Sequence, residues 1–444
     1  MLIYKRTFDG DTLMKQTIRK RRVKLIIAVI VMLFAGIIYA WSITKTPFMQ
    51  LSGDNVVNAT QLGLNYTITI IFFCIGGFIA GLISKQSSTG FRFVLSAMML
   101  FTCFYTVSLQ TVTIHHTENY FMLYMAYGVL GGLGIGVAYV TVISTINMWY
   151  PEKRGFASGI MLMSFGLSLL VIGSIVDILG KSEAVGWRTT YVIIAISLGA
   201  VFLIAAIFIR PPTKNTVFPE PKAPDEASSN NKTLPGSEAP AGGEAPQQPV
   251  LQKNYTAIEM INRSSFYLIF VYIAILASSG SAAISFAKDI IIDVGATERF
   301  SVIAVGMLGV SNGLGRLISG WLFDKFGIKH TQFISSAAAI MAPLTVVTAI
   351  AVNSLILGVL GLCLCGFSYG FAPTTSSIFA SKFYGPRNFP LNFSILNLIL
   401  IPAPFAAMLA GGIKSSTGGF MTAFLILTGL TVIGFFINLL IKRP

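Results

Sequence analysis

The segment NNKTLPGSEAPAGGEAPQQPV, residues 230–250, lies near the middle of a chain of 444 residues and differs sharply in composition from its surroundings. It is rich in Pro, Ala, Gly, Ser and Glu, and such a segment cannot bury enough apolar surface to fold. We therefore predict a flexible linker over residues 211–258. The linker separates two parts of nearly equal length, residues 24–210 and 259–444, and residues 1–23 remain as an N-terminal tail.

On both sides of this linker, apolar segments of about 20 residues recur, which is the length that a helix needs to cross a bilayer. The chain is 54% hydrophobic and 11% charged, with a mean hydropathy of +0.75, whereas soluble domains carry about 25% charged residues. We predict an all-α membrane protein with about twelve transmembrane helices in two six-helix bundles. The expected spans are 24–46, 61–84, 91–110, 119–146, 155–179, 187–209, 264–287, 300–323, 331–352, 354–380, 391–413 and 418–441.

Basic residues concentrate in alternate connections between the apolar segments. If the N-terminus is placed in the cytoplasm, roughly 24 of the 31 Lys and Arg residues fall on the cytoplasmic side. This distribution explains the formal net charge of +14 without nucleic-acid binding. We expect a monomeric, multi-pass protein of the cell membrane, embedded in the lipid bilayer, with both termini and the linker in the cytoplasm.

The two parts share a local sequence pattern. Residues Trp149–Gly155 read WYPEKRG and follow the fourth span, and residues Phe383–Asn388 read FYGPRN and follow the tenth. At the same offset Gly136 corresponds to Gly370, and both spans are rich in glycine, which lets helices approach closely in lipid. Repeated halves are typical of alternating-access transporters, whose substrate site lies near the midplane between the halves.

Residues Gly320–Lys329, GWLFDKFGIK, lie between the eighth and ninth spans and resemble the signature loop of the major facilitator superfamily. The resemblance implies that the acidic residue of this loop caps a neighbouring helix or pairs with a cation, and so holds the cytoplasmic side closed in one state. The matching loop of the first half, Gly81–Lys85, is degenerate and lacks the acidic residue. We predict four gating residues, which are Asp324, Lys325, Gly320 and Arg154.

Three further segments resemble oxalate/formate antiporters and monocarboxylate transporters. They are Gly36–Trp41 in the first span, Trp149–Gly159 before and within the fifth, and Asn312–Arg316 in the eighth. In this group the arginine of the eighth helix binds the substrate carboxylate, so the resemblance implies that role for Arg316. The motifs do not define which anion is carried.

Arg316 also stands out on physical grounds. It lies eight residues before Asp324, about 12 Å along the helix and near the middle of a ~30 Å hydrocarbon layer. A cation at this depth costs at least ~2.5 kcal/mol unless it faces a cavity or a partner. A guanidinium can bind a carboxylate through two parallel hydrogen bonds. We predict substrate binding by Arg316, and the alternatives are a structural ion pair and a snorkelling side chain.

Two departures from the resembling families bear on the mechanism. Monocarboxylate transporters of the animal type have an Asp, tied to proton coupling, where this chain has Asn312, and an amide does not exchange a proton near neutral pH. The oxalate-transporting relative has a lysine in the eleventh helix, whereas residues 391–413 contain no Lys or Arg. We therefore favour a monocarboxylate or similar small organic anion over oxalate, carried by exchange or uniport.

Other aromatic and polar side chains at suitable positions in the spans are further candidates for binding the substrate. They are Tyr39, Trp41 and Lys45 of the first span, Tyr139 of the fourth, Asn312 of the eighth, Tyr369 of the tenth and Asn397 of the eleventh. Aromatic rings can enclose an anion, and asparagine amides can supply neutral hydrogen bonds. The alternatives are ordinary packing for the aromatic residues and interfacial snorkelling for the lysine.

Two segments are expected to interrupt helices. Residues 278–281, Ser-Ser-Gly-Ser, lie within the seventh span and act either as a hinge or as small residues that allow close packing. Pro402 and Pro404 lie within the eleventh span and predict a kink, because proline cannot complete the helical hydrogen bonds.

Several function classes find no support in the sequence. It contains no glycine-rich phosphate loop for ATP, and its four cysteines lie inside apolar runs, so we expect no cofactor and no metal site. We also expect no enzyme activity, because the spans contain no nucleophile or acidic pair in a catalytic pattern. The alternatives left open are a major facilitator transporter of another cargo (a larger amphipathic acid, a sugar or a drug) and a non-transporting membrane sensor.

Overall fold

The computed structural model describes residues 2–44, 59–110, 120–213, 216, 218, 253–402 and 404–442, and these residues form helices and short connections. In the first part the helices are α1 (Leu2–Ala35), η1 (Gly36–Ala40), α2 (Trp41–Thr44), α4 (Ala59–Leu82), η2 (Ile83–Lys85), α5 (Thr89–Gln110), α6 (Tyr120–Leu123), η3 (Tyr124–Gly131), α7 (Gly132–Trp149), α8 (Arg154–Lys181) and α9 (Gly186–Phe208). In the second part they are α10 (Ala257–Ile261), α11 (Ser264–Asp293), α12 (Glu298–Ala351), α13 (Leu355–Lys382), α14 (Phe389–Asn397), η4 (Leu398–Leu400), α15 (Pro404–Thr417) and α16 (Met421–Leu440).

The predicted set of spans is present in the described residues. Ten helical stretches are long and apolar enough to cross a membrane. One of them, α12, contains two spans, because Gly327 adopts φ 75° and ψ −176° and interrupts the helix in its middle. The end of α1, continued by η1 and α2, provides the first span. The all-α fold with two six-helix bundles is therefore confirmed.

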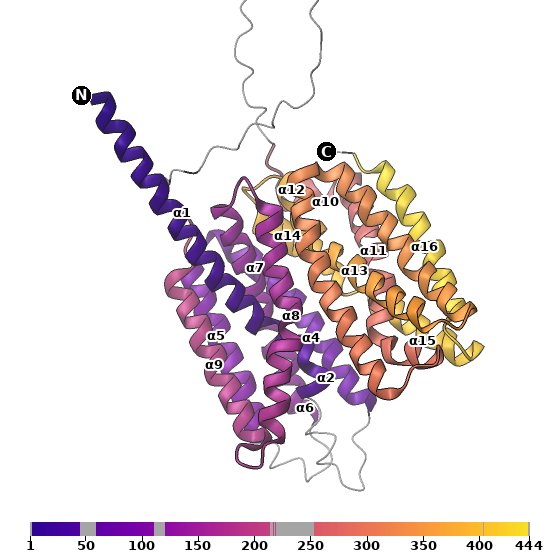
Figure 1. Cartoon of the computed structure of the whole chain (residues 1–444). Coiled ribbons are helices and arrows are strands. Elements are labelled where there is room, and N and C mark those ends of the chain that lie inside the picture. The colour runs from indigo at the N-terminus through magenta and orange to yellow at the C-terminus, as the bar shows by residue number, and fades with distance from the viewer. Residues whose placement is uncertain are drawn as a thin grey trace, which may run out of the picture.

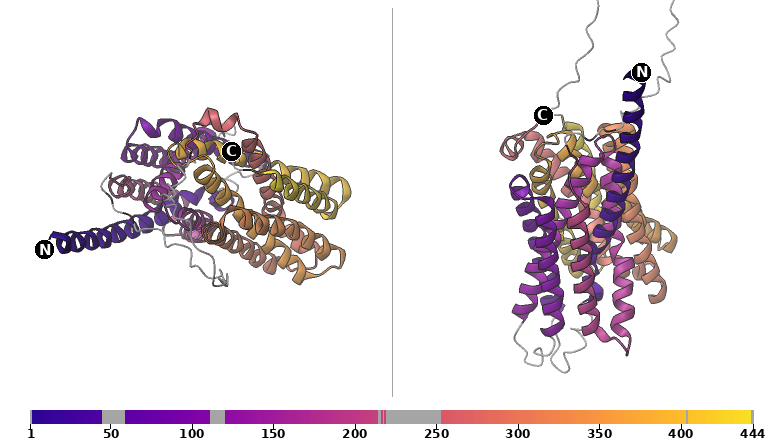
Figure 2. Two further views of the ribbon diagram at one scale, coloured as in Figure 1. Left: turned by 90° about the horizontal axis from the view of Figure 1, so that it is seen from above. Right: turned by 90° about the vertical axis from the view of Figure 1, so that its left-hand side faces the viewer.

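The helices before and after the linker form two bundles that lie side by side (Figures 1 and 2). Large apolar side chains remain exposed on the outer helices of both bundles, as expected for surfaces in contact with lipid; examples are Ile178, Ile207, Ile433 and Phe436. By contrast, nearly every residue of α7 is buried. This helix therefore lies in the interior and can contribute to a site between the bundles.

One end of the molecule carries α10, the N-terminus and the C-terminus (Figure 1). We call it the linker side. Because successive spans run in opposite directions, it also contains the connections at residues 83–88, 150–153, 209–213, 324–330 and 383–388.

The N-terminal tail that the sequence predicts over residues 1–23 is helical in the structure. Helix α1 begins at Leu2 and projects beyond the bundle on the linker side (Figure 1). Residues 2–22 contain no proline, and seven of these 21 residues are Lys or Arg, which favour helices. The first spanning helix can therefore continue into water at little cost.

The internal repeat appears as matched close contacts within each bundle. A Cβ atom added at Gly136 of α7 would lie 2.0 Å from the carbonyl oxygen of Phe73 in α4. A Cβ atom added at Gly370 of α13 would lie 2.4 Å from the carbonyl oxygen of Asn312 in α12. The fourth helix therefore packs on the second as the tenth packs on the eighth, through glycines at corresponding positions of the repeat. Only glycine allows the backbones to approach so closely.

The two predicted helix interruptions have different outcomes. In α11 the backbone leaves helical geometry at Phe286 (φ −122°, ψ 17°), whereas residues 278–281 remain helical. Those residues instead allow close packing, since a Cβ atom added at Gly280 would lie 2.3 Å from Cβ of Tyr369. In the eleventh span the expected break is confirmed, because α14 gives way to η4 and a turn before α15 begins.

Candidate functional site

A small enclosed cavity of about 20 Å³ lies between the two bundles. This volume holds about one water molecule. Helices α4, α7 and α8 form its wall from the first bundle, and α11, α12, α13, α14 and η4 form its wall from the second. The lining residues are Phe73, Tyr139, Phe165, Ala277, Arg316, Tyr369, Ala372, Pro373, Ser376, Asn397, Ile399 and Leu400.

Arg316 supplies the positive charge in this lining, and it is only 2% exposed. Its Nη1 donates a hydrogen bond to the carbonyl oxygen of Leu162 in α8 at 2.8 Å. The side chain has room beside α8 because residue 166 is glycine, where an added Cβ atom would lie 3.3 Å from the guanidinium carbon. The guanidinium of the second bundle is therefore bound to the backbone of the first.

Asn312 lies one turn before Arg316 on α12 and orients its side chain. The amide oxygen of Asn312 accepts a hydrogen bond from Nε of Arg316 at 3.3 Å. Asn312 itself is not among the residues that line the cavity. The structure therefore places it behind the arginine, where it can hold the guanidinium toward the space between the bundles.

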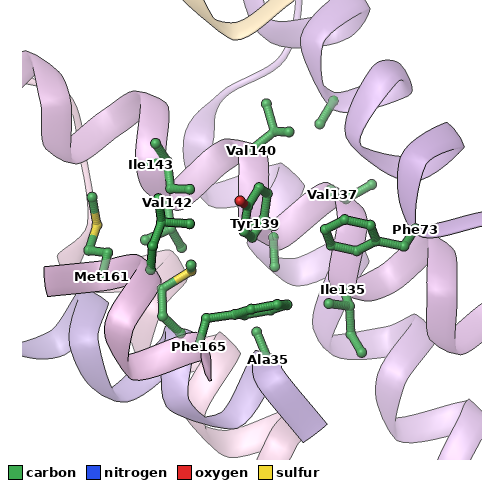
Figure 3. Close-up of a cluster of buried hydrophobic side chains, with 14 of the residues drawn as sticks. Ala35, Phe73, Ile135, Val137, Tyr139, Val140, Val142, Ile143, Met161 and Phe165 are labelled. Carbon is green, nitrogen blue, oxygen red and sulfur yellow. The ribbon is translucent and has the colours of Figure 1, made fainter. Parts of the chain in front are cut away.

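Tyr139 lies at the centre of a group of aromatic rings. Its ring centroid is 5.1 Å from that of Phe73 and 5.2 Å from that of Phe165, both in edge-on geometry, and Figure 3 shows the three rings around a common space. Phe393 of α14 stacks on the same tyrosine at 5.9 Å. Such packing fixes the rings and leaves an apolar wall opposite Arg316.

The second bundle contributes Tyr369 and Asn397 to the same cavity. Asn397 is 3% exposed, and its side-chain oxygen has no hydrogen-bond partner among the described residues. A buried polar atom without a partner costs about 1–3 kcal/mol, and in native proteins it commonly marks a place for water or a ligand. The structure thus brings four of the predicted residues together, and these are Arg316, Tyr139, Tyr369 and Asn397.

The remaining predicted binding residues all come from the first span. Trp41 packs inside the first bundle, with its ring centroid 4.5 Å from that of Tyr127, and it does not line the cavity. Tyr39 lies in η1, but its side chain is outside the described part of the structure, and Lys45 lies outside the described residues altogether. The described lining of the cavity therefore comes from the other helices.

Several lining residues were missed by the sequence analysis. Phe73, Phe165 and Ala277 are apolar residues in apolar spans, so nothing in the sequence distinguishes them from residues that face lipid. Pro373 and Ser376 of α13 offered a weak signal, since a proline within a span often accompanies a functional irregularity.

On the linker side, Asp324 joins the two bundles. Its carboxylate accepts hydrogen bonds from the backbone N–H groups of Gly155 at 3.1 Å and Phe156 at 2.6 Å, in the first turn of α8. The negative charge therefore stabilises the N-terminus of a helix of the other bundle. The ammonium group of Lys382 lies 3.8 Å away. Beside this contact, a Cβ atom added at Gly320 would lie 2.1 Å from the carbonyl oxygen of Gly155.

The other two predicted gating residues occupy different places. Lys325 lies over the rings of Trp321 and Phe326 of its own helix, at 4.8 and 5.1 Å from their centres, and so stabilises α12 locally. Arg154 begins α8 and lines a cavity of about 220 Å³ between the bundles. The lysine that approaches Asp324 is instead Lys382, which no sequence motif had indicated.

Residues 25–400 match the sequence model of the Major Facilitator Superfamily, which is most of the chain. The chain belongs to this superfamily. Its members are transporters rather than enzymes, and the apolar helices of this chain agree with a multi-pass membrane protein.

Curated relatives within the Major Facilitator Superfamily are distant. An uncharacterized MFS-type transporter of Escherichia coli, YhjX, is 26% identical and covers 86% of this chain and 85% of its own. The oxalate:formate antiporter of Oxalobacter formigenes is 24% identical over 70% of this chain and 68% of its own. Monocarboxylate transporter 12 of Rattus norvegicus is 22% identical over 68% of this chain and 63% of its own.

Solved structures of superfamily members share the fold. FucP in the outward conformation has a TM-score of 0.66 at 14% identity and covers 96% of this chain and 100% of its own. The proton:xylose symporter XylE has a TM-score of 0.68 at 13% identity and covers 97% of both chains. At these identities the likeness concerns the arrangement of helices.

Proposed function

We propose that this protein is a secondary active transporter of a small organic anion, a monocarboxylate such as formate or lactate, that works by alternating access of its two bundles. The observation that carries the proposal is the buried guanidinium of Arg316 in the wall of the cavity between the bundles. A cation in that position is costly unless it serves a ligand or a partner. Two relatives, an oxalate:formate antiporter and a monocarboxylate transporter, agree with an anionic cargo.

The hydrogen bonds of Arg316 suggest how binding would be coupled to movement. A carboxylate can replace the carbonyl oxygen of Leu162 as the acceptor for Nη1, because a hydrogen bond between two oppositely charged groups is stronger than one from the guanidinium to a neutral carbonyl oxygen. That exchange would release the second bundle from the backbone of α8. The cavity holds only about one water molecule, so the bundles must move apart to admit even a small anion.

We propose exchange or uniport rather than proton symport. The group that contacts Nε of Arg316 is the amide of Asn312, which does not exchange a proton near neutral pH. Among the described residues that line the cavity there is no acid. From the distribution of Lys and Arg we further propose that the linker side faces the cytoplasm of a cell-membrane protein. Because one chain supplies both walls of the cavity, we propose that a single chain forms the translocation path.

Counterflow in liposomes tests this proposal. Purified protein is reconstituted with or without internal anion, and uptake of labelled formate, lactate, pyruvate and oxalate is measured for the wild type, Arg316→Gln and Arg316→Lys. We expect kcat/KM to fall about 100-fold or more in Arg316→Gln. Arg316→Lys should be intermediate, because lysine retains the charge but not the planar fork.

Lys325→Gln is the matched control, since this lysine contacts rings of its own helix and lies away from the cavity. It should transport like the wild type. Undiminished uptake by Arg316→Gln would refute the role of the arginine. Accumulation driven by an inward proton gradient would overturn exchange and uniport in favour of proton symport.

A further inference from the structure

A second and much larger cavity, of about 620 Å³, opens on the linker side of the molecule. Its volume is typical of sites for small molecules. The first bundle supplies most of the wall, through the connection between α4 and α5 and the ends of α7 and α9. Arg387 and Pro390 of the second bundle complete the wall. Neither the proposed carboxylate site nor the Asp324 contact shares a residue with this cavity.

The lining of this cavity is strongly basic. It contains four cations, Lys85, Arg92, Arg210 and Arg387, and the described residues around it include no Asp or Glu. Hydroxyl groups from the connection between α4 and α5 lie among them. Such a combination of cations and hydroxyl donors favours a multiply charged anion.

Arg92 provides the decisive observation, because it is a buried cation with unused donors. It is 5% exposed, and its Nε and Nη1 atoms are buried without a hydrogen-bond partner among the described residues. Only Nη2 has a partner among the described residues, since it donates a hydrogen bond to the hydroxyl oxygen of Thr89 at 3.3 Å. Leaving charged donors unsatisfied in a buried position is expensive. Arg92 also lies in the first turn of α5, and a helix N-terminus favours an anion.

Comparison of the two halves shows which charge is missing. Asp324 follows Gly320 by four residues, and Lys85 stands at the same distance after Gly81. Asp324 brings a carboxylate to the start of a helix of the other bundle. Lys85 instead donates a hydrogen bond to the side-chain oxygen of Asn388 at 2.7 Å, and Asn388 directly precedes α14. This second contact between the bundles is therefore rich in cations and lacks the negative charge of the first.

We propose that this cavity binds a phosphate group, which is held by Arg92, Lys85 and Arg210 of the first bundle and by Arg387 of the second. An ionised phosphate carries one negative charge as a diester and up to two as a monoester, and it offers two or three acceptor oxygens to the four cations. Bound there, it supplies a negative charge at the contact where the first half has Lys85 rather than an acidic residue, and it joins the linker-side ends of the bundles. The phosphate belongs either to a dissolved phosphate compound or to the headgroup of a membrane phospholipid.

Thermal unfolding of the full-length protein tests the site without relying on transport. Delipidated protein in a neutral detergent is titrated with inorganic phosphate, with chloride at matched ionic strength as the reference. We expect phosphate to raise the unfolding midpoint of the wild type. In Arg92→Gln and Arg387→Gln the phosphate concentration for half the effect should rise about tenfold or more, because each removes a charge-assisted contact.

Lys329→Gln is the matched control, since Lys329 is an exposed cation of the linker side outside the cavity lining. It should respond to phosphate like the wild type. If Arg92→Gln does not fold, the exposed Arg387 still tests the site. Arg316→Gln should keep the phosphate response, so a failure of the proposed carboxylate site and a failure of this one are distinguishable.

Lipid vesicles distinguish the two sources. If inorganic phosphate has no effect, but phosphatidylglycerol stabilises the wild type relative to phosphatidylcholine and this advantage is lost in Arg387→Gln, the phosphate is that of a lipid headgroup and the site stands. An equal response of the wild type, Arg92→Gln and Arg387→Gln would overturn the proposal. So would the absence of any response to phosphate and to phosphatidylglycerol.

Discussion

At the scale of single residues, two of the polar side chains that line the central cavity are in different situations. The guanidinium of Arg316 donates to Leu162 and Asn312 within the protein. The side-chain oxygen of Asn397 has no such partner among the described residues, although the residue is buried. Because Asn397 also lines the cavity, and nearly all buried polar groups in native proteins are hydrogen-bonded, we propose that it functions in binding rather than in folding.

Replacing Asn397 by leucine should therefore separate binding from stability. Its side-chain oxygen has no hydrogen bond to lose in the described structure, and the two side chains are similar in size, so we expect an unfolding midpoint equal to or above that of the wild type. We expect KM for the transported anion to rise roughly tenfold, because a polar contact to the anion is lost. Scanning fluorimetry and initial rates of uptake provide the two measurements.

The control lies in the same helix. Asn392 donates a hydrogen bond from its amide nitrogen to the carbonyl oxygen of Tyr255 at 3.1 Å, so Asn392→Leu should cost about 1–3 kcal/mol of stability. If Asn397→Leu lowers the unfolding midpoint as much as Asn392→Leu does, the asparagine in the cavity is a structural residue and our assignment is wrong.

At the scale of helices, glycine contacts set the spacing between neighbours in each bundle. α7 meets α4 at Gly136, and α13 meets α12 at Gly370. At both places an added Cβ atom would lie closer to the backbone of the neighbouring helix than van der Waals contact allows. These contacts determine how far Tyr139 and Arg316 project into the cavity, because both residues lie on helices that pack in this way. The repeat that is visible in the sequence therefore also appears in the distance between neighbouring helices of each bundle.

Gly136→Ala should destabilise the first bundle. The new Cβ atom would lie 2.0 Å from a backbone oxygen, which cannot move aside without shifting α4. Overpacking of this kind costs about 1–3 kcal/mol, and we expect a lower unfolding midpoint and less folded protein in the membrane. Thermal unfolding in detergent measures the effect.

Gly429→Ala is the matched control for this experiment. Gly429 lies within α16, and nothing is found within 4 Å of a Cβ atom added there. Because alanine favours helix over glycine, this variant should be as stable as the wild type or slightly more stable. Equal destabilisation by both substitutions would show that the contact at Gly136 does not limit stability.

At the scale of the whole molecule, two contacts close the linker side. In one, Gly320 and Asp324 of α12 meet the start of α8. In the other, a Cβ atom added at Gly81 of α4 would lie 2.9 Å from the Cα atom of Leu391 in α14. These contacts are equivalent in the repeat, but only the first has a carboxylate at the helix N-terminus. Alternating access requires that both open when the bundles rock.

Asp324→Ala should shift the protein toward the conformation that is open on the linker side. The substitution removes two charge-assisted hydrogen bonds to backbone N–H groups, which together are worth about 1–2 kcal/mol or roughly tenfold in the ratio of conformations. Spin labels at the exposed positions Gln86 and Lys329, one on each bundle, can report the change as a longer distance.

Lys325→Met serves as the control because Lys325 adjoins Asp324 in sequence yet contacts only rings of its own helix in the described structure. Its distance distribution should match that of the wild type. Asp324→Asn retains an acceptor oxygen without the charge and should fall between the two. Identical distances in all four proteins would show that Asp324 does not govern closure.

The amino-acid sequence by itself determined the number of the spans and the repeat, while the linker and the side that faces the cytoplasm stay predictions. These features depend on local properties, since the length and hydropathy of a segment decide whether it crosses a bilayer. The depth of Arg316 followed from counting residues along one helix. The capping role of Asp324 followed from the motif that surrounds it, and the structure places it at the start of α8.

Only the tertiary structure decided which side chains meet. Phe73, Phe165 and Ala277 line the cavity because their helices face the other bundle, and hydropathy does not distinguish that face from one in contact with lipid. Trp41 faces Tyr127 inside its own bundle for the same reason. Arg92 looked in the sequence like an ordinary cation of a membrane boundary. Its unsatisfied donors became visible only once α5 was packed among its neighbours, because burial is a property of the assembled bundles.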